Sequence, residues 1–270
     1  MTRLMTLVLA LGCAFATATT TAAELDYRVD DATRILQDLK RMPENAIPPA
    51  LLNRAYAVAV IPGMIKGGFV LGGSYGRGIV VARRADGRWS NPAFVQLAGG
   101  SFGPQIGVQS TDLVLVFKSQ RALDGLSNGK ITLGGDASVA AGPVGRQTSA
   151  ATDLQLSSEI YSYARTRGFF AGLSLDGSVL SMDRAANGQY YGGEQDPARI
   201  LTDTSIPAPV SGRRFTDTLA AIAPAMPEQA SSRAATATAD PDMSMPAPSG
   251  ARTYGIDEGA TALPADGGIY

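Results

Sequence analysis

One serine of this chain stands in a pattern that nucleophilic hydrolases use. Gly72-Gly73-Ser74-Tyr75-Gly76 matches the G-x-S-x-G arrangement, in which a sharp turn exposes a serine hydroxyl. Activation of that hydroxyl needs a general base, normally histidine, and the 270-residue sequence contains no histidine. The pattern also lies between two strand-like runs, not between a strand and a helix. We therefore interpret it as a Gly-rich turn and not as a nucleophile.

Two further patterns could carry chemistry, and both have a simpler interpretation. Gly125–Lys130 resembles a phosphate loop, but it is one residue short and Ile131 stands where a metal-binding Ser or Thr is needed. Asp176 and Asp183 could act as a glycosidase pair, although aspartates more often form turns. With no histidine and one cysteine, zinc, haem and iron–sulfur sites are almost excluded. We predict no catalytic residues, no metal, no cofactor and no enzymatic activity.

Binding chemistry is a better match to the charged side chains. Residues 54–200 hold 14 Lys/Arg against 10 Asp/Glu, whereas both ends of the chain are acidic. No long basic stripe is present, which argues against a nucleic-acid partner. Near strand ends and at the end of the first expected helix lie the candidate lipid-binding cations Lys40, Arg41, Lys66, Arg77, Arg83 and Arg84. Each alone is an ordinary solvated charge; together they are predicted to attract anions such as phospholipid headgroups.

Aromatic residues gather late in the apolar part of the chain. Phe169, Phe170, Tyr190 and Tyr191 are the candidates for apolar contact with an acyl chain. The alternative is core and sheet-face packing, which is the usual role of such residues. The sequence leaves both interpretations open.

The elements that must position these residues are mostly short strands. Most of the 31 glycines lie between Gly63 and Gly193, inside apolar runs, and Asp86-Gly87 and Asp176-Gly177 are typical hairpin turns. Amphipathic spacing predicts a helix over Tyr27–Met42, with short helices after Pro48-Pro49, over Ser119–Leu126 and over Asp196–Leu201. We predict an α+β fold: a mainly antiparallel, Gly-rich, barrel-like sheet with a few short helices packed on it.

The N-terminus has the features of an export signal. Arg3 precedes an apolar run and small residues up to Ala23, so residues 1–23 are predicted to be a signal peptide and Glu24 the mature start. This predicts a secreted, periplasmic protein. Gly12-Cys13 also resembles a lipoprotein cleavage site, so a lipid anchor at Cys13 is the alternative.

The C-terminal part has a different composition. From Thr202 onward Pro, Ala, Ser and Thr dominate, and such a segment buries too little surface to offset its ordering entropy. We predict a domain over 24–201 and a largely disordered tail over 202–270, in which Phe215–Ile222 could form one short helix. Loss of 216–270 is then expected to leave stability almost unchanged.

Several blocks of the ordered part, taken in order, resemble the SYLF domain. They are AVAVIPGMIKGGFVLGGSYGRGIVVARRADGRWSNPAFVQLAGGSFGPQIGVQSTDLVLVF, KITLGGDASVAAGPVGR and YSYARTRGFFAGLSLDGSVLSMDRAANGQYYG. The resemblance spans roughly residues 30–201. It implies a lipid-binding domain, phosphoinositide-directed and actin-associated in eukaryotic members, and mostly exported in bacterial ones.

This resemblance, together with the export signal, implies a function. We expect a non-enzymatic phospholipid-binding domain of an exported bacterial envelope protein, whose partner is an anionic phospholipid or membrane surface, with a phosphoinositide-like lipid among the candidates. In eukaryotic members a basic N-terminal helix carries lipid binding, whereas the acidic residues in and beside Tyr27–Met42 offset its basic ones and leave no strongly cationic face. The expected ligand is therefore an anionic phospholipid in general. The alternative is a structural or protein-interaction module of the envelope, with a protein partner and no lipid ligand.

Overall fold

Strands with apolar side chains on both faces form the centre of the molecule. The computed structural model describes residues 21–41, 47–68, 71–102, 107–143, 157–166 and 169–224. Within these ranges nine strands form one sheet. They are β1 (Ala57–Gly68), β2 (Leu71–Ala82), β3 (Ala93–Phe102), β4 (Gly107–Phe117), β5 (Lys130–Thr132), β6 (Val139–Ala141), β7 (Ile160–Thr166), β8 (Phe169–Gly172) and β9 (Val179–Met182).

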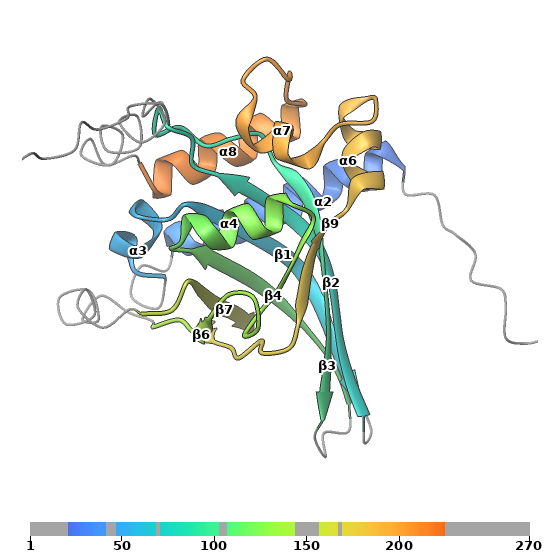
Figure 1. Ribbon diagram of the computed structural model, residues 1–270, viewed down its shortest axis with the longest axis vertical. Coiled ribbons are helices and arrows are strands. Elements are labelled where there is room, and N and C mark those ends of the chain that lie inside the picture. Colours follow the sequence, from blue (N-terminus) through green and yellow to red (C-terminus); the bar gives the residue numbers. More distant parts are fainter. Residues whose placement is uncertain are drawn as a thin grey trace, which may run out of the picture. The chain divides into compact units, whose positions relative to one another are not determined.

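The sheet is mixed and curls into a half-barrel (Figure 1). Its order is β5-β9-β3-β2-β1-β4-β7-β6, and β8 pairs with β7. The pairs are antiparallel except β6 with β7. The predicted α+β class and its mainly antiparallel sheet are therefore confirmed. The predicted hairpin glycines Gly87 and Gly177 both have positive φ angles of 79°.

Burial on both faces explains the apolar runs in the sequence. Along β1, Val58 and Val60 enter one core, while Ala57 and Ala59 enter a second core on the opposite face. Successive side chains of a strand point to opposite faces, so a strand covered on both sides carries apolar residues at every position. The fold thus consists of one sheet between two helical layers.

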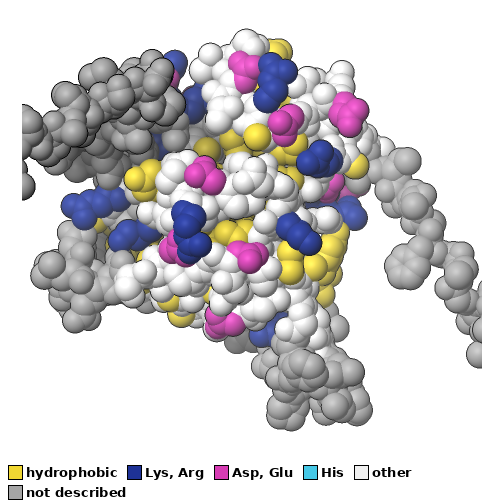
Figure 2. Space-filling model, in the orientation of Figure 1, with side chains coloured by type: hydrophobic (Ala, Val, Ile, Leu, Met, Phe, Trp, Pro, Cys, Tyr) yellow, Lys and Arg dark blue, Asp and Glu magenta, His cyan; other side chains and the backbone are white. Residues whose placement is uncertain are grey.

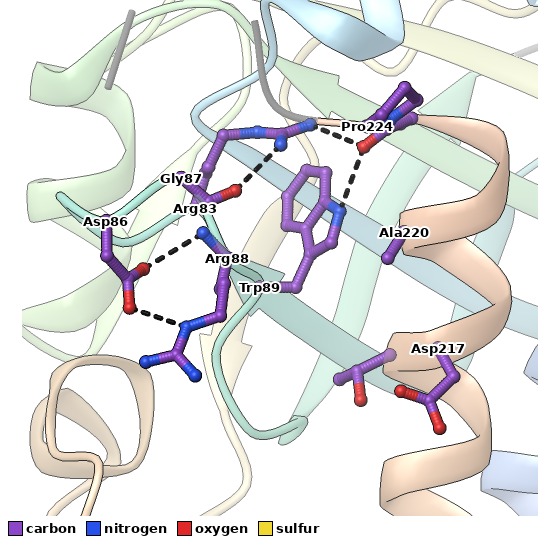
Figure 3. A pocket seen from close by; sticks show the side chains of 10 residues that line it. Arg83, Asp86, Gly87, Arg88, Trp89, Asp217, Ala220 and Pro224 are labelled. Atoms are coloured by element: carbon purple, nitrogen blue, oxygen red, sulfur yellow. Dashed lines mark hydrogen bonds and ion pairs between the residues drawn. The ribbon is translucent and has the colours of Figure 1, made fainter. Parts of the chain in front are cut away.

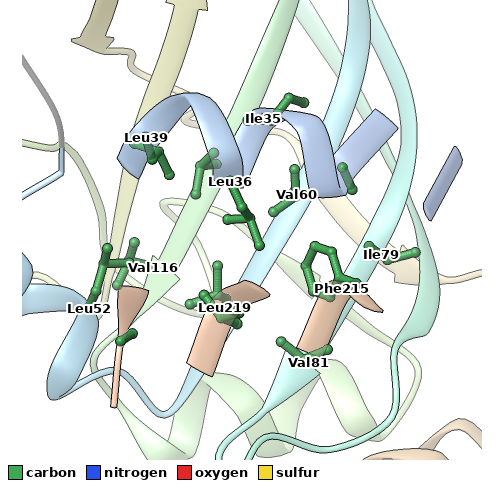
Figure 4. Close-up of a cluster of buried hydrophobic side chains, with 14 of the residues drawn as sticks. Ile35, Leu36, Leu39, Leu52, Val60, Ile79, Val81, Val116, Phe215 and Leu219 are labelled. Carbon is green, nitrogen blue, oxygen red and sulfur yellow. The ribbon is translucent and has the colours of Figure 1, made fainter. Parts of the chain in front are cut away.

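The first core lies under helices α2 (Ala22–Arg41) and α8 (Val210–Ile222), with α3 (Pro49–Asn53) and α6 (Arg184–Tyr191) beside them. Figure 4 shows the apolar side chains of α2 and α8 gathered over the strands. Phe215 and Leu219 of α8 have no exposed surface and belong to this core. Arg214 of α8 pairs with Asp30 of α2 at 2.9 Å. The two helices therefore pack as a pair on the sheet.

The position of α8 corrects the predicted start of the tail at residue 202. The fold continues through Ala223, which is fully buried, and the predicted helix Phe215–Ile222 begins earlier, at Val210. Composition misled here because α8 contributes only a few core side chains, spaced four residues apart. Residues 225–270 lie outside the described residues, as do residues 1–20 with Cys13.

The second core lies under α4 (Gln120–Ser127) and α7 (Pro197–Thr202). The Ser119 side chain accepts a hydrogen bond from the backbone N–H of Ala122 and so caps α4. Asp196 caps α7 in the same way through the backbone N–H of Ala198, with Pro197 at the first helical position. Both short helices begin near the positions that the sequence predicted.

Close backbone packing explains two of the glycines. A Cβ atom on Gly78 of β2 would lie 2.2 Å from the carbonyl oxygen of Val60 in the neighbouring strand β1. A Cβ atom on Gly142 would lie 2.1 Å from the Tyr163 ring. Neither contact is tolerable, so the fold itself requires glycine at both positions.

None of the helices in the described ranges is long and apolar enough to span a membrane.

Candidate functional site: a groove beside helix α2

An open groove separates the first half of α2 from the β1–β2 hairpin. Its volume is about 370 Å³. We call it the α2 groove and define it by Glu24, Tyr27, Arg28, Asp31, Ile65, Tyr75 and Arg77. The helix supplies the first four of these residues and the two strands supply the rest.

An irregularity in β1 brings the strand residues to this groove. The register of β1 shifts between Ile61 and Met64 against β4, and Gly63 there has a φ of 56°. The Gly63 N–H donates to Asp112 Oδ1 at 2.9 Å, which fixes the bulge. Beyond it Ile65 of β1 pairs with Tyr75 of β2, and both side chains line the groove opposite α2.

The groove is unusual in its exposed apolar surface. Tyr27 is 69% exposed, Ile65 52% and Tyr75 43%; with Val210, they are the large hydrophobic residues exposed among those that the structure describes. Isolated exposed hydrophobic residues are common, but a group of them at one hollow marks an interaction surface. The arrangement can hold an apolar or amphipathic partner.

Two arginines add positive charge to the groove. The Arg77 Nε donates to the Tyr75 hydroxyl at 2.7 Å, and this hydrogen bond raises the pKa of Arg77. Arg28 lies on the inner side of α2, where its guanidinium approaches the Phe94 ring at 5.7 Å. Burial, and then the charge of Arg77, lower the pKa of Arg28. The acids Glu24 and Asp31 accompany these cations, so the groove has mixed charge.

Arg83 and Arg84 were predicted to attract lipid, but the structure uses both inside the fold. Arg83 is 5% exposed and stacks on Trp89 at 4.0 Å. Its guanidinium donates to the carbonyl oxygens of Gly87 at 3.0 Å and Ala223 at 2.9 Å (Figure 3). Arg84 is half-buried and donates to the Asp203 carbonyl at 3.2 Å. Both guanidinium groups thus donate to backbone carbonyl oxygens of the fold.

The hollow in Figure 3, of about 380 Å³, lies between the Asp86–Trp89 turn and α8. The Trp89 indole N–H also donates to the Ala223 carbonyl, at 3.3 Å. Arg83 and Trp89 thus hold the C-terminal end of α8, an arrangement that we call the α8 clasp. We therefore assign these contacts a role in the stability of the fold and not in ligand binding.

The other predicted cations do not join into one face. Lys66 is half-exposed and lines a separate small hollow with Ser174 and Asp176. Lys40 and Arg41 are exposed at the far end of α2, where Arg41 pairs with Asp38 at 3.3 Å. On the face seen in Figure 2, Lys and Arg side chains are scattered among Asp and Glu. Of the six predicted cations, the structure brings only Arg77 to the α2 groove.

The predicted aromatic contacts are core residues where their side chains are described. Phe170 is 4% and Tyr190 9% exposed, and Tyr190 packs edge-on against Phe94 and Tyr191. The Tyr191 hydroxyl donates to the Pro92 carbonyl at 2.6 Å. Burial raises the pKa of Tyr190 to about 12. The side chain of Phe169 lies outside the described residues.

The sequence patterns that could carry chemistry have structural roles. Gly72–Gly76 lies inside β2, which corrects our interpretation of it as a turn. Gly125–Lys130 ends α4 and enters β5, as the sequence indicated. Asp176 accepts from the Ser174 hydroxyl in a turn, and Asp183 caps α6. Among the described residues, no group of three or more His, Cys, Asp and Glu could hold a metal ion.

The sequence interpretation missed Arg28 and the exposed apolar residues of the groove. Arg28 had a recognisable signal, because it is three residues after Leu25 and four before Ala32, both fully buried. A cation on the apolar stripe of a helix is exceptional. Ile65 and Tyr75 gave no such signal, since their exposure depends on where the bulge turns the strand.

Comparison with known proteins identifies the central part of the chain. Residues 98–222 match the model of the Ysc84 family, described as "Las17-binding protein actin regulator". Protein YSC84 of Saccharomyces cerevisiae is 40% identical over 162 residues, which is 59% of this chain and 34% of that protein. LAS seventeen-binding protein 3 of the same yeast is 38% identical over 169 residues, or 62% and 37% of the two chains.

A human relative gives the same picture. SH3 domain-containing YSC84-like protein 1 of Homo sapiens is 36% identical over 175 residues, or 63% of this chain and 51% of that protein. The chain therefore spans between about a third and a half of the length of these curated relatives. The family description and the names of the second yeast relative and the human relative refer to binding, regulation or domain content, and none of them names a catalytic activity. The defining residues of the α2 groove precede residue 98, outside the segment that matches the family model.

Proposed function

Since residues 98–222 match the model of the Ysc84 family, we propose that this chain is a non-enzymatic module that binds the surface of an anionic phospholipid membrane. The observation that carries the proposal is the grouping of Tyr27, Ile65 and Tyr75, all exposed, around one groove that also contains Arg77. Tyrosine rings favour the boundary between headgroups and acyl chains, and arginine attracts phosphate.

The size of this surface predicts weak and reversible attachment. A few exposed apolar side chains bury only part of their area in a membrane, at about 25 cal/mol per Å². One basic residue near an anionic surface adds about 1 kcal/mol. Binding is therefore expected to depend on both the apolar contacts and the ionic strength, and to fall short of permanent anchoring.

Co-sedimentation of the full chain with phosphatidylglycerol vesicles at low salt tests the proposal. We expect binding by the wild type and a loss of at least about tenfold in the triple variant Tyr27→Ser, Ile65→Ser, Tyr75→Ser, because each exposed apolar side chain contributes. The matched control is Val210→Ser, which removes a residue 63% exposed outside the groove-lining set. Equal binding by all three proteins, or none by the wild type, would contradict the proposal.

The same proposal includes export. We propose that residues 1–23 direct the domain to the cell envelope, with attachment at Cys13 as the alternative outcome. Mass spectrometry of the mature protein distinguishes these possibilities, because cleavage after Ala23 leaves Glu24 at the N-terminus. This cleavage would remove the first two residues of α2 and keep the buried Leu25.

A protein partner is the second candidate function. It is favoured by the relatives, whose family description and names refer to Las17 binding and actin regulation. The α2 groove could hold an amphipathic segment of such a partner, since its surface is apolar and of mixed charge. Capture of a partner that the triple variant no longer binds, without vesicle binding by the wild type, would favour this function over the membrane.

A further inference from the structure

Arg28 has a polar atom that the fold leaves without an acceptor. Its side chain is only 9% exposed, and Nη2 donates to Glu24 Oε1 at 3.2 Å. The other terminal nitrogen, Nη1, is buried and has no hydrogen-bond partner among the residues that the structure describes. A buried N–H group without an acceptor is costly, and such groups are rare in folded proteins.

The surroundings of Arg28 increase that cost. Arg77 lines the same groove, and its charge disfavours the protonated form of Arg28. Burial acts in the same direction and is the larger cause of the lowered pKa of Arg28. The charges of Glu24 and Asp183 act in the opposite direction and only partly compensate. An anion between the two guanidinium groups would relieve their repulsion and supply the missing acceptor.

We propose that Arg28 and Arg77 bind one phosphate group in the inner part of the α2 groove. This inference rests on the proposed function and names its recognition element. Phosphate suits the pair because its several oxygens can accept from two planar guanidinium forks at once.

The rest of the groove indicates what is attached to the phosphate. Tyr27 and Ile65 present apolar surface beside the arginines, and a phosphate ester of an amphiphile would place its apolar part there. A lipid headgroup and free phosphate share the recognised chemistry. The two sources are separated by offering each of them alone to the protein.

The test uses the full chain and three variants. Arg28→Met removes the guanidinium and approximately keeps the volume. It is expected to fold, because the partner Glu24 is 53% exposed and does not become a buried unpaired charge. Arg28→Lys keeps the charge and removes the planar fork. Arg34→Met is the matched control: it lies on the same helix, has the same change in charge and has a side chain that is 71% exposed.

Two measurements are made on each protein. The first is the shift of Tm when inorganic phosphate replaces chloride at equal ionic strength. The second is co-sedimentation with phosphatidylglycerol vesicles. We expect a phosphate-dependent rise of Tm in the wild type and in Arg34→Met that is absent in Arg28→Met and reduced in Arg28→Lys. Vesicle affinity should fall about tenfold in Arg28→Met, which corresponds to about 1.4 kcal/mol.

Each result decides the inference. In one outcome the wild type shows the phosphate-dependent rise of Tm, Arg28→Met loses it, and the wild type does not bind vesicles. This outcome supports the phosphate site, with free phosphate as the ligand, and contradicts only the proposed membrane function. Vesicle binding that Arg28→Met loses, without a Tm response, supports a headgroup phosphate. If Arg28→Met behaves like Arg34→Met in both measurements, the inference is wrong. If Arg28→Met does not fold, Arg28→Lys decides: the inference is wrong if this variant matches the wild type in both the Tm response and vesicle binding.

Discussion

Arg28 and Arg83 are two largely buried arginines that lie against aromatic rings, and they differ in what their N–H groups reach. Arg83 donates to the backbone carbonyl oxygens of Gly87, in the adjoining turn, and of Ala223, 140 residues later in the chain. Arg28 donates to Glu24, one helical turn away, and leaves Nη1 without a partner among the described residues. The first arrangement joins parts of the fold, whereas the second adds little to it.

This difference separates a stabilising region from a binding region. The α8 clasp surrounds Arg83 with fixed acceptors and buries the end of α8. The α2 groove surrounds Arg28 with exposed apolar side chains and a second cation. A buried arginine whose two terminal nitrogens both donate to backbone carbonyl oxygens, as in Arg83, is explained by folding alone. One whose terminal nitrogen lacks an acceptor among the described residues, as in Arg28, needs a further explanation. The comparison therefore predicts opposite consequences for changes in the two regions.

Truncation should give the largest effect. Composition alone indicated that loss of 216–270 would leave stability almost unchanged, but this segment contains the fully buried Leu219 and Ala223 and the acceptor of the α8 clasp. We expect the free energy of unfolding to fall by about 4 kcal/mol or more, because truncation of one buried leucine side chain alone costs about 2–5 kcal/mol. Removal of 225–270 should cost less than about 0.5 kcal/mol. Urea denaturation measures both, and equal stability of the two truncated proteins would show that α8 does not hold the fold.

Removal of the clasp arginine should come next. Arg83→Met leaves the Ala223 and Gly87 carbonyl oxygens without this donor and removes the stacking on Trp89. We expect a loss of about 2–4 kcal/mol in the free energy of unfolding. Arg88→Met is the control, because the Arg88 side chain is 76% exposed and forms a surface ion pair with the neighbouring Asp86. If Arg83→Met loses no more free energy of unfolding than Arg88→Met, Arg83 is not a stabilising residue and the contrast with Arg28 is wrong.

Removal of the groove arginine should change stability least. Arg28→Met is expected to shift the free energy of unfolding by less than about 1 kcal/mol in either direction, because the lost ion pair with Glu24 is offset by relief of desolvation. Thermal unfolding in chloride buffer, without phosphate, measures this. A loss as large as that of Arg83→Met would mean that Arg28 is a structural residue like Arg83.

The fold was predictable from the sequence where the chemistry is local. Apolar runs and Asp-Gly turns predicted an antiparallel sheet, and the spacing of Val29, Ile35 and Leu36 predicted α2. Helix α8 was only partly found, because two core residues in a polar segment make a weak pattern. Its burial depends on α2, which lies nearly two hundred residues earlier in the chain.

The candidate site was less predictable than the fold. Arg77 and Arg83 look alike in the sequence, since both belong to the same strand-like stretch between Gly72 and Asp86. Only tertiary contacts decide that Arg83 reaches Ala223 and is buried, while Arg77 stays at the surface beside Tyr75. Exposure of Ile65 likewise depends on the bulge at Gly63, whose position is set by pairing with a distant strand.

The central claim is that the α2 groove is the surface that meets a membrane, and a fluorophore placed there tests it most directly. In the full chain with Cys13→Ser, an environment-sensitive dye is attached at Ile65→Cys in the groove, or at Asp124→Cys, exposed on α4 on the opposite face. With phosphatidylglycerol vesicles at low salt, we predict a blue shift of emission at position 65 and none at position 124. A shift at 124 alone, equal shifts at both positions, or no shift at either would contradict the account.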